Sequence, residues 1–196
     1  MHRAVTLALL GASLLAAPPV AAQQAVKARP PALFAGAGGG LGWFRLSCPD
    51  LCVGERNMGW NGVAQVGVQF GRLWNVGLEF NGFFDSRERI RETAHFIGAV
   101  AHWYPAEVKR FWLKGGLGVF NYTGQDPLDG DDTPFTVSAL GVQFGAGYDV
   151  PVSGRFHLAP YAGFIGNIGG DLEADGLISS EPNMSHVQLG VMLRYR

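Results

Sequence analysis

A two-residue alternation of apolar with polar or small side chains is the feature of this sequence that most constrains its fold. The alternation is clearest at the C-terminus, where Val187, Leu189, Val191, Leu193 and Tyr195 occupy every second position. Mainly polar residues and glycine fill the positions between them. Because successive side chains of a β-strand point to opposite faces, this pattern predicts a strand with one apolar and one polar face.

The same alternation recurs along the chain and predicts eight strands in all. They cover residues 32–47, 62–72, 76–84, 90–104, 110–122, 136–150, 155–168 and 186–196. Most exceed the roughly 5–6 residues that are usual in soluble sheets, and a tilted strand that crosses a membrane needs about 9–11. Strand length therefore favours a membrane-spanning sheet, although alternation alone leaves open which way the first, fourth and seventh strands face.

The connections between the predicted strands alternate in length. Long or strongly charged connections cover residues 47–59, 85–89, 123–134 and 169–183, whereas short ones cover 72–75, 105–109 and 151–154. Bacterial transmembrane barrels combine short periplasmic turns with longer outer loops. An even number of strands then places both ends of the barrel chain on the side of the short turns.

The N-terminal segment has the layout of a secretory signal peptide. Arg3 precedes an apolar stretch over residues 5–17, and Val20, Ala21 and Ala22 suit a cleavage site. The stretch is shorter than the ~20 residues of a spanning helix, so cleavage is favoured over an uncleaved anchor. We expect residues 1–22 to be removed, 23–31 to form a short extension and 32–196 to form one barrel domain.

Composition agrees with strands that face lipid on one side and a crowded interior on the other. Charged residues make up 16% of the chain, against about 25% of an average soluble domain. Glycine accounts for 29 of the 196 residues. The net charge of −1 offers no basic surface of the kind that binds nucleic acid.

Polar residues on the second face of the strands are expected to fill the interior, because an eight-stranded barrel is just wide enough to be packed by side chains. The expected lumen network comprises Gln65, Gln69, Glu79, His102, Lys114, Gln143, Asp149 and Arg194, with His157, His186 and Gln188 on the same face. Buried charges must pair, which points to Glu79 with Lys114 and to Asp149 with Arg194. A static plug is favoured over a gate or ion path.

Aromatic residues gather near the ends of the predicted strands. Membrane proteins place tryptophan and tyrosine at the membrane–water interface. The expected aromatic girdle comprises Trp43, Trp60, Trp74, Trp103, Tyr104, Phe111 and Tyr195. Ordinary core packing of these rings is the alternative interpretation.

With these strands laid out, the sequence resembles the small eight-stranded outer-membrane β-barrels of the OmpA/OmpX type over about residues 30–196. The resemblance rests on the alternation, the glycine-rich inward faces and the last strand. It departs from the family at the C-terminus, where Tyr195 is followed by Arg196 instead of being the final aromatic residue. It implies an all-β, closed, antiparallel, up-and-down transmembrane barrel in the outer membrane of a Gram-negative bacterium.

The resemblance also implies partners and a range of roles. Outer-membrane lipids would surround the barrel, and the barrel-assembly machinery would insert it. Members of the family stabilise the envelope, act as adhesins or evasion factors, or form minor pores. We expect a monomer with a structural or surface-interaction role; the alternatives are a small porin-like solute or ion channel, a lipid-modifying enzyme and a soluble lipocalin-like periplasmic binder.

Cys48 and Cys52 lie in the first long connection and favour a disulfide, since the chain is expected to be exported. A metal half-site or a redox pair is the alternative, but no histidine lies near them in the sequence. Closing so short a loop would fix its shape more than it would stabilise the fold.

Other candidate sites lack a complete motif, so we expect no enzyme, cofactor or metal site. The histidines are scattered, and no Gly-x-Ser-x-Gly pattern accompanies them. The acidic run at residues 126–132 lacks the bidentate glutamate of a calcium loop. The glycine-rich run at 36–42 is not followed by the Lys-Ser/Thr of a nucleotide loop.

Overall fold

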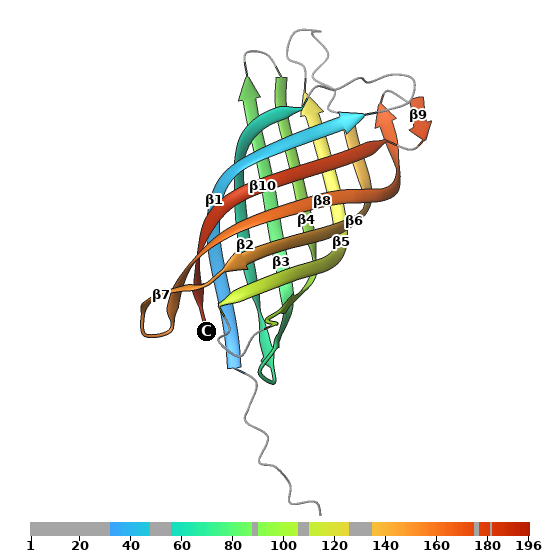
Figure 1. The fold of residues 1–196 in the computed structure, drawn as a ribbon. Coiled ribbons are helices and arrows are strands. Elements are labelled where there is room, and N and C mark those ends of the chain that lie inside the picture. Colours follow the sequence, from blue (N-terminus) through green and yellow to red (C-terminus); the bar gives the residue numbers. More distant parts are fainter. Residues whose placement is uncertain are drawn as a thin grey trace, which may run out of the picture. The chain divides into compact units, whose positions relative to one another are not determined.

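The structure is a computed structural model that describes residues 32–47, 56–87, 90–105, 110–125, 135–174, 177–180 and 182–196. The strands in these segments form a single antiparallel sheet that closes on itself as a barrel (Figure 1). Within the same segments, no helix is long and apolar enough to cross a membrane. The predicted fold class, a closed antiparallel barrel of eight strands, is confirmed.

Eight long strands make up the barrel wall. They are β1 (Ala32–Ser47), β2 (Asn57–Phe70), β3 (Trp74–Arg87), β4 (Ile90–Trp103), β5 (Phe111–Gln125), β6 (Phe135–Tyr148), β8 (Phe156–Ala174) and β10 (Asn183–Tyr195). Each pairs with its neighbours in the chain, and β10 pairs with both β8 and β1, which closes the wall. The short strands β7 (Val150–Ser153) and β9 (Leu177–Ser180) pair only with the two ends of β8.

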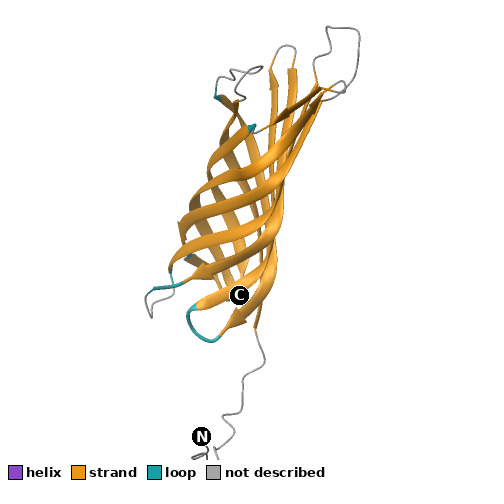
Figure 2. Cartoon of the chain, turned by 90° about the vertical axis from the view of Figure 1, so that its right-hand side faces the viewer, coloured by secondary structure: helices purple, strands orange, loops and turns teal. Residues whose placement is uncertain are grey.

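The strands are staggered by ten residues around the barrel. The ring of paired residues that starts at Leu33 in β1 returns to β1 at Trp43. Between them it passes through Val68, Val76, Ala101, Gly115, Phe144, Phe164 and Val187. Closing a sheet with such a stagger requires strands tilted by about 35–45° to the barrel axis, and the tilt is plain in Figure 2.

The two ends of the barrel differ. One, called here the terminal end, holds the start of β1, the C-terminus and the connections at residues 71–73, 104–110 and 149–155 (Figure 1). Gly71 and Gly154 make tight turns there in the left-handed region, with φ of 59° and 53°. The opposite end, the loop end, receives the connections after β1, β3, β5 and β8.

Several strands extend further toward the loop end than the alternation predicts, and β2 and β8 extend the most. β2 begins at Asn57, inside the connection predicted at residues 47–59, and β8 continues to Ala174 and forms a hairpin with β9 inside the connection predicted at 169–183. The added residues of β8, 169–174, include two glycines and two acidic residues, whereas Met58 and Trp60 continue the alternation in the added part of β2. Away from lipid both faces of a strand meet water, so the alternation that reveals a strand in the sequence fades in the added part of β8.

Inward-facing glycines let the barrel close at its seam. Gly40 in β1 lies opposite Gly190 in β10, and a Cβ atom added at Gly40 would overlap the carbonyl oxygen of Leu189 and the Cα atom of Gly190. Gly62 in β2 is different, because a Cβ atom there would have no neighbour within 4 Å. The two positions therefore separate the effect of close strand approach from the effect of losing a glycine.

We expect Gly40→Ala to lower the free energy of unfolding by about 1–3 kcal/mol, since the added methyl group must push β1 and β10 apart. Gly62→Ala is the matched control and should change it by less than about 0.5 kcal/mol. Urea titration of the refolded protein in detergent micelles, followed by the gel mobility of the folded form, measures both. Equal destabilisation by the two variants would contradict the seam assignment.

Candidate functional site: the filled lumen and the apolar wall

The outward face of the barrel is apolar on every long strand. Val66, Leu117 and Phe144 are 56%, 59% and 62% exposed, and similar residues continue around the wall. The structure also settles the facing of the first, fourth and seventh strands, which alternation left open: Leu33, Ile97 and Phe164 face outward. Soluble monomers rarely expose a continuous apolar band of this extent, whereas acyl chains would solvate it.

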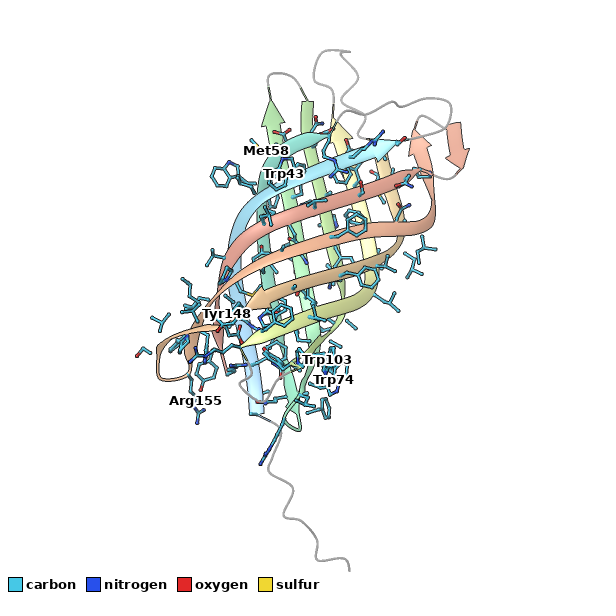
Figure 3. The ribbon with its side chains drawn as sticks, viewed as in Figure 1. Trp43, Met58, Trp74, Trp103, Tyr148 and Arg155 are labelled. Carbon is cyan, nitrogen blue, oxygen red and sulfur yellow. The ribbon has the colours of Figure 1, made fainter. Side chains whose placement is uncertain are left out.

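Most residues of the predicted aromatic girdle lie on this outer face. Trp60, Trp74, Trp103, Phe111 and Tyr195 are exposed and Trp43 is partly exposed. Trp74 and Trp103 lie toward the terminal end, and Trp43 lies closer to the loop end (Figure 3). Rings therefore occur toward both ends of the apolar band.

The prediction was wrong for Tyr104, which is buried with 2% of its surface exposed. Tyr104 follows β4 directly and continues the phase that turns His102 inward, so its side chain enters the lumen. There its hydroxyl donates a hydrogen bond to Asp149 Oδ2 over 3.2 Å and accepts one from Arg194 Nη1 over 2.9 Å. A phenol is protonated at neutral pH and can donate, and burial raises the pKa of the Tyr104 phenol further.

Asp149 is the centre of the terminal-end half of the lumen, and its side chain is fully buried. Its Oδ1 accepts hydrogen bonds from Trp112 Nε1 over 3.0 Å and from Arg194 Nη1 over 3.1 Å. Its Oδ2 forms an ion pair with Arg196 Nη1 at 3.0 Å. We call Asp149, Tyr104, Trp112, Arg194 and Arg196 the Asp149 cluster; it ties the last two arginines of the chain to the junction between β6 and β7.

A second buried ion pair lies across the lumen between β3 and β5. Lys114 Nζ is 2.5 Å from Glu79 Oε1, and neither side chain has more than 1% of its surface exposed. Asn81 Nδ2 donates to the same carboxylate oxygen over 2.6 Å. Because two charges removed from water are costly unless they face each other, this geometry fixes the facing of both strands.

Four residues of the predicted lumen network lie outside these ion pairs. Gln65 is buried and its amide lies 3.1 Å from the sulfur of Met192. His102 is buried with its ring edge-on to Trp112 at 5.0 Å between centroids. Gln143 is buried with no hydrogen bond to another described side chain, and Gln69 is only half-buried.

Two asparagines and a tyrosine that were not predicted from the sequence also join this interior. Asn61 Nδ2 donates to Gln188 Oε1 over 2.8 Å and lies 3.0 Å from the Tyr161 hydroxyl. Asn75 Nδ2 lies 3.4 Å from the Tyr104 hydroxyl. Both asparagines occupy the inward phase of their strands just outside the predicted strand limits, so extending the alternation by one step would have found them.

The loop-end half of the lumen is mainly apolar, which a polar network alone does not predict. The predicted lumen residue His186 is buried there, with its ring 5.3 Å from that of Phe83. Phe44 stacks on Tyr122 at 4.8 Å between ring centroids and also contacts Phe83 and Phe120, at 5.6 and 6.2 Å. The whole buried group, called here the aromatic cluster, comprises Phe44, Leu46, Phe83, Ala94, Phe96, Phe120, Tyr122, Val137, Ala139, Ile165 and Met184. It packs the interior on the loop side of the polar network.

One carboxylate lies beside the aromatic cluster. Glu92 Oε1 accepts a hydrogen bond from the Tyr122 hydroxyl over 2.8 Å, and its Oε2 accepts one from Asn57 Nδ2 over 2.6 Å. These bonds join β2, β4 and β5 across the interior near their loop ends. The lumen is thus bridged by side chains at both ends and in the middle.

Several predicted features fall outside the described residues: Cys48 and Cys52, the segments 1–22 and 23–31, and the acidic run at 126–132. Among the side chains that the structure describes, no group of three or more histidine, cysteine, aspartate or glutamate residues could hold a metal ion. His95 faces outward and lies 3.3 Å from the amide of Asn121.

Comparison with known proteins identifies the fold. No protein-family model matches the sequence, and no curated protein matches it. Among solved structures, Ail, the attachment invasion locus protein of Yersinia pestis, has a TM-score of 0.59 at 15% identity and covers 83% of this chain and 98% of its own. Neisserial surface protein A has a TM-score of 0.56 at 14% identity, over 85% of this chain and 99% of its own. Because the identity is low, these comparisons show a shared fold alone. The two proteins and this chain have the fold of the small outer-membrane barrels.

We expect Lys114→Met to destabilise the barrel by about 3–5 kcal/mol, because it leaves the Glu79 carboxylate buried without its cation. The double variant Glu79→Gln/Lys114→Met removes both charges and should recover most of the loss. The free energy of unfolding of the two single variants and the double variant, compared in one cycle, measures the coupling. Additive effects would show that the pair does not interact.

Proposed function

We propose that this protein spans the outer membrane of a Gram-negative bacterium and acts there as a structural or surface-interaction protein that does not conduct. The apolar outer wall and closed backbone support the membrane location, since hydrocarbon accepts a sheet only when it has no free edge. The fold shared with Ail and Neisserial surface protein A agrees with this location. The terminal end then faces the periplasm and the loop end faces outward.

The filled lumen is the observation that carries the non-conducting role. From the terminal end, the Asp149 cluster, the Glu79–Lys114 pair and the aromatic cluster succeed one another along the interior. A buried apolar layer such as the aromatic cluster opposes the passage of ions, because an ion inside it would lose its water without gaining a partner. A channel would need these side chains to move aside together.

The soluble lipocalin-like alternative requires the opposite distribution of side chains. A soluble carrier would line its cavity with apolar residues and expose polar ones, whereas here Leu78 is 60% exposed and Glu79, its neighbour in β3, is 2% exposed. The two faces of the wall are thus those of a membrane-spanning barrel.

The lipid-modifying enzyme is the weaker alternative on the described contacts. Such an enzyme would need a histidine beside a nucleophile near the membrane surface. His102 is instead packed against Trp112 inside the barrel, and the outward His95 contacts an asparagine. We therefore retain the proposal that the protein has no catalytic centre, no cofactor and no resident metal.

The arrangement of long connections at one end of a rigid barrel supports a surface role. Loops held on a rigid scaffold are the usual sites of binding, and the names of both similar proteins refer to attachment or to the surface. We propose that the loop-end connections carry any recognition, that the barrel works as a monomer, and that the barrel-assembly machinery inserts it. We also propose that a signal peptide directs export and that Cys48 and Cys52 form a disulfide in the first of these connections.

Fractionation of producing cells tests the location. The protein is expected in the outer-membrane fraction, with a gel mobility that shifts on boiling, because a closed barrel resists detergent until it is heated. Replacement of its first 22 residues by an initiating methionine is the control and should leave the protein unexported. Recovery of the full-length protein in the soluble periplasmic fraction without a heat shift would overturn the membrane assignment.

Planar-bilayer recording tests the closed lumen. Purified wild-type protein that has passed the heat-shift assay should show no discrete unitary conductance, while a known porin in the same bilayers should. A steady conductance step that disappears or changes size in Glu79→Gln would favour the channel alternative instead.

A further inference from the structure

Three of the four strand pairs carry the same arrangement of side chains at the terminal end. Each has an exposed arginine one or two residues before its first strand, and two exposed aromatic residues directly opposite each other on its two strands. These Arg–aromatic units are Arg72 with Trp74 and Trp103, Arg110 with Phe111 and Tyr148, and Arg155 with Phe156 and Tyr195. The ring pairs lie on β3–β4, β5–β6 and β8–β10, and the three arginines lie in the connections that precede β3, β5 and β8.

The aromatic residues of each unit are direct cross-strand partners. The rings of Trp74 and Trp103 stack with centroids 6.3 Å apart, and those of Phe156 and Tyr195 are 5.4 Å apart. Each of the six rings is between 37% and 46% exposed. Figure 3 shows Trp74, Trp103, Tyr148 and Arg155 at the same end of the barrel. An exposed ring pair at this level suits the carbonyl and glycerol zone of a bilayer, where aromatic side chains prefer to lie.

In the third unit the arginine is held against one of the rings. Arg155 Nη1 donates to the Tyr195 hydroxyl over 3.0 Å, with its guanidinium 5.9 Å from the Tyr195 ring centroid. A guanidinium held in this way keeps other N–H donors free, and a planar fork of donors matches the oxygens of a phosphate. The long side chain lets the charge sit in the headgroup layer while the stem stays apolar.

The charge at this end is unbalanced within the described residues. Arg72, Arg110 and Arg155 form no ion pair there, and the carboxylate of that end, Asp149, is buried and already held by two other arginines. Glu107 and Lys109, in the same connection as Arg110, lie outside the described residues and cancel each other in charge. The described rim therefore presents positive charge alone, which favours an anionic over a zwitterionic partner.

We propose that the three Arg–aromatic units bind the phosphate groups of anionic phospholipids in the membrane leaflet at the terminal end. The inference rests on the proposed membrane location and adds a lipid specificity to it. Within the described residues, the fourth strand pair, β1–β2, has no such ring pair: it places Leu33 opposite Val68 near that end. The units of the described part of the chain therefore occupy three of the four strand pairs.

Lipid selectivity measured by electron spin resonance tests the proposal. The protein is reconstituted in phosphatidylcholine vesicles with spin-labelled phosphatidylglycerol or phosphatidylcholine as the probe. Each unit should favour the anionic probe roughly fivefold, as expected of one basic residue at a membrane surface. The preference should fall to about one in Arg72→Gln/Arg110→Gln/Arg155→Gln, and salt should weaken it in the wild type.

Arg45→Gln/Arg56→Gln is the matched control, because both arginines are exposed near the loop end and lie outside the units. It should retain most of the preference. The control removes two positive charges and the triple variant three, so a loss that is equal per charge removed would show that net charge alone sets the preference and would overturn the site assignment. An unchanged preference in the triple variant would overturn it as well. If that variant does not fold, the three single exchanges replace it, each expected to remove part of the preference.

The heat-shift assay on each reconstituted protein separates the two proposals. Wild-type protein that inserts but shows no preference for the anionic probe overturns the lipid sites and leaves the membrane location intact. Wild-type protein that does not insert at all overturns the membrane location, and the lipid sites with it.

Discussion

Every other feature of this barrel depends on the pairing of its first and last strands. β1 and β10 are joined over the residues from Ala35, opposite Tyr195, to Ser47, opposite Asn183. Inside a bilayer an unpaired backbone N–H or C=O finds no water, so a sheet that crosses hydrocarbon must have no free edge. Closure in turn requires a stagger, a tilt and close strand approach at glycines such as Gly40 and Gly190.

Closure also dictates what the interior must contain. Eight strands leave a lumen that side chains can fill, and any charge inside must meet its opposite. The Asp149 cluster and the Glu79–Lys114 pair satisfy this condition in the terminal-end half. The aromatic cluster fills most of the other half, and the Glu92 carboxylate beside it accepts hydrogen bonds from Tyr122 and Asn57. Division of the lumen into a polar and an apolar layer gives the barrel stable packing and, on our proposal, a seal.

The outer wall is constrained by lipid rather than by protein neighbours. Its middle carries only what acyl chains tolerate, and its polar side chains gather toward the ends, as with the outward pair His95 and Asn121 in the loop-end part of β4 and β5. At the terminal end the Arg–aromatic units combine aromatic rings with arginines, and on our proposal these meet the glycerol zone and the headgroups of the bilayer. The polarity of the outer wall therefore changes along the barrel axis as the polarity of a bilayer changes along its normal.

Alternation in the sequence alone determined the number of strands, their approximate limits and the facing of residues such as Glu79 and Lys114, because side-chain direction in a strand is a local property with a period of two. It could not determine the distances between strands, since these depend on the ten-residue stagger that only closure sets. For that reason the contacts of Tyr104, Asn61 and Asn75 and the gathering of the Phe44 ring with its neighbours appeared only in the tertiary structure, where residues distant in the chain meet at one level of the lumen.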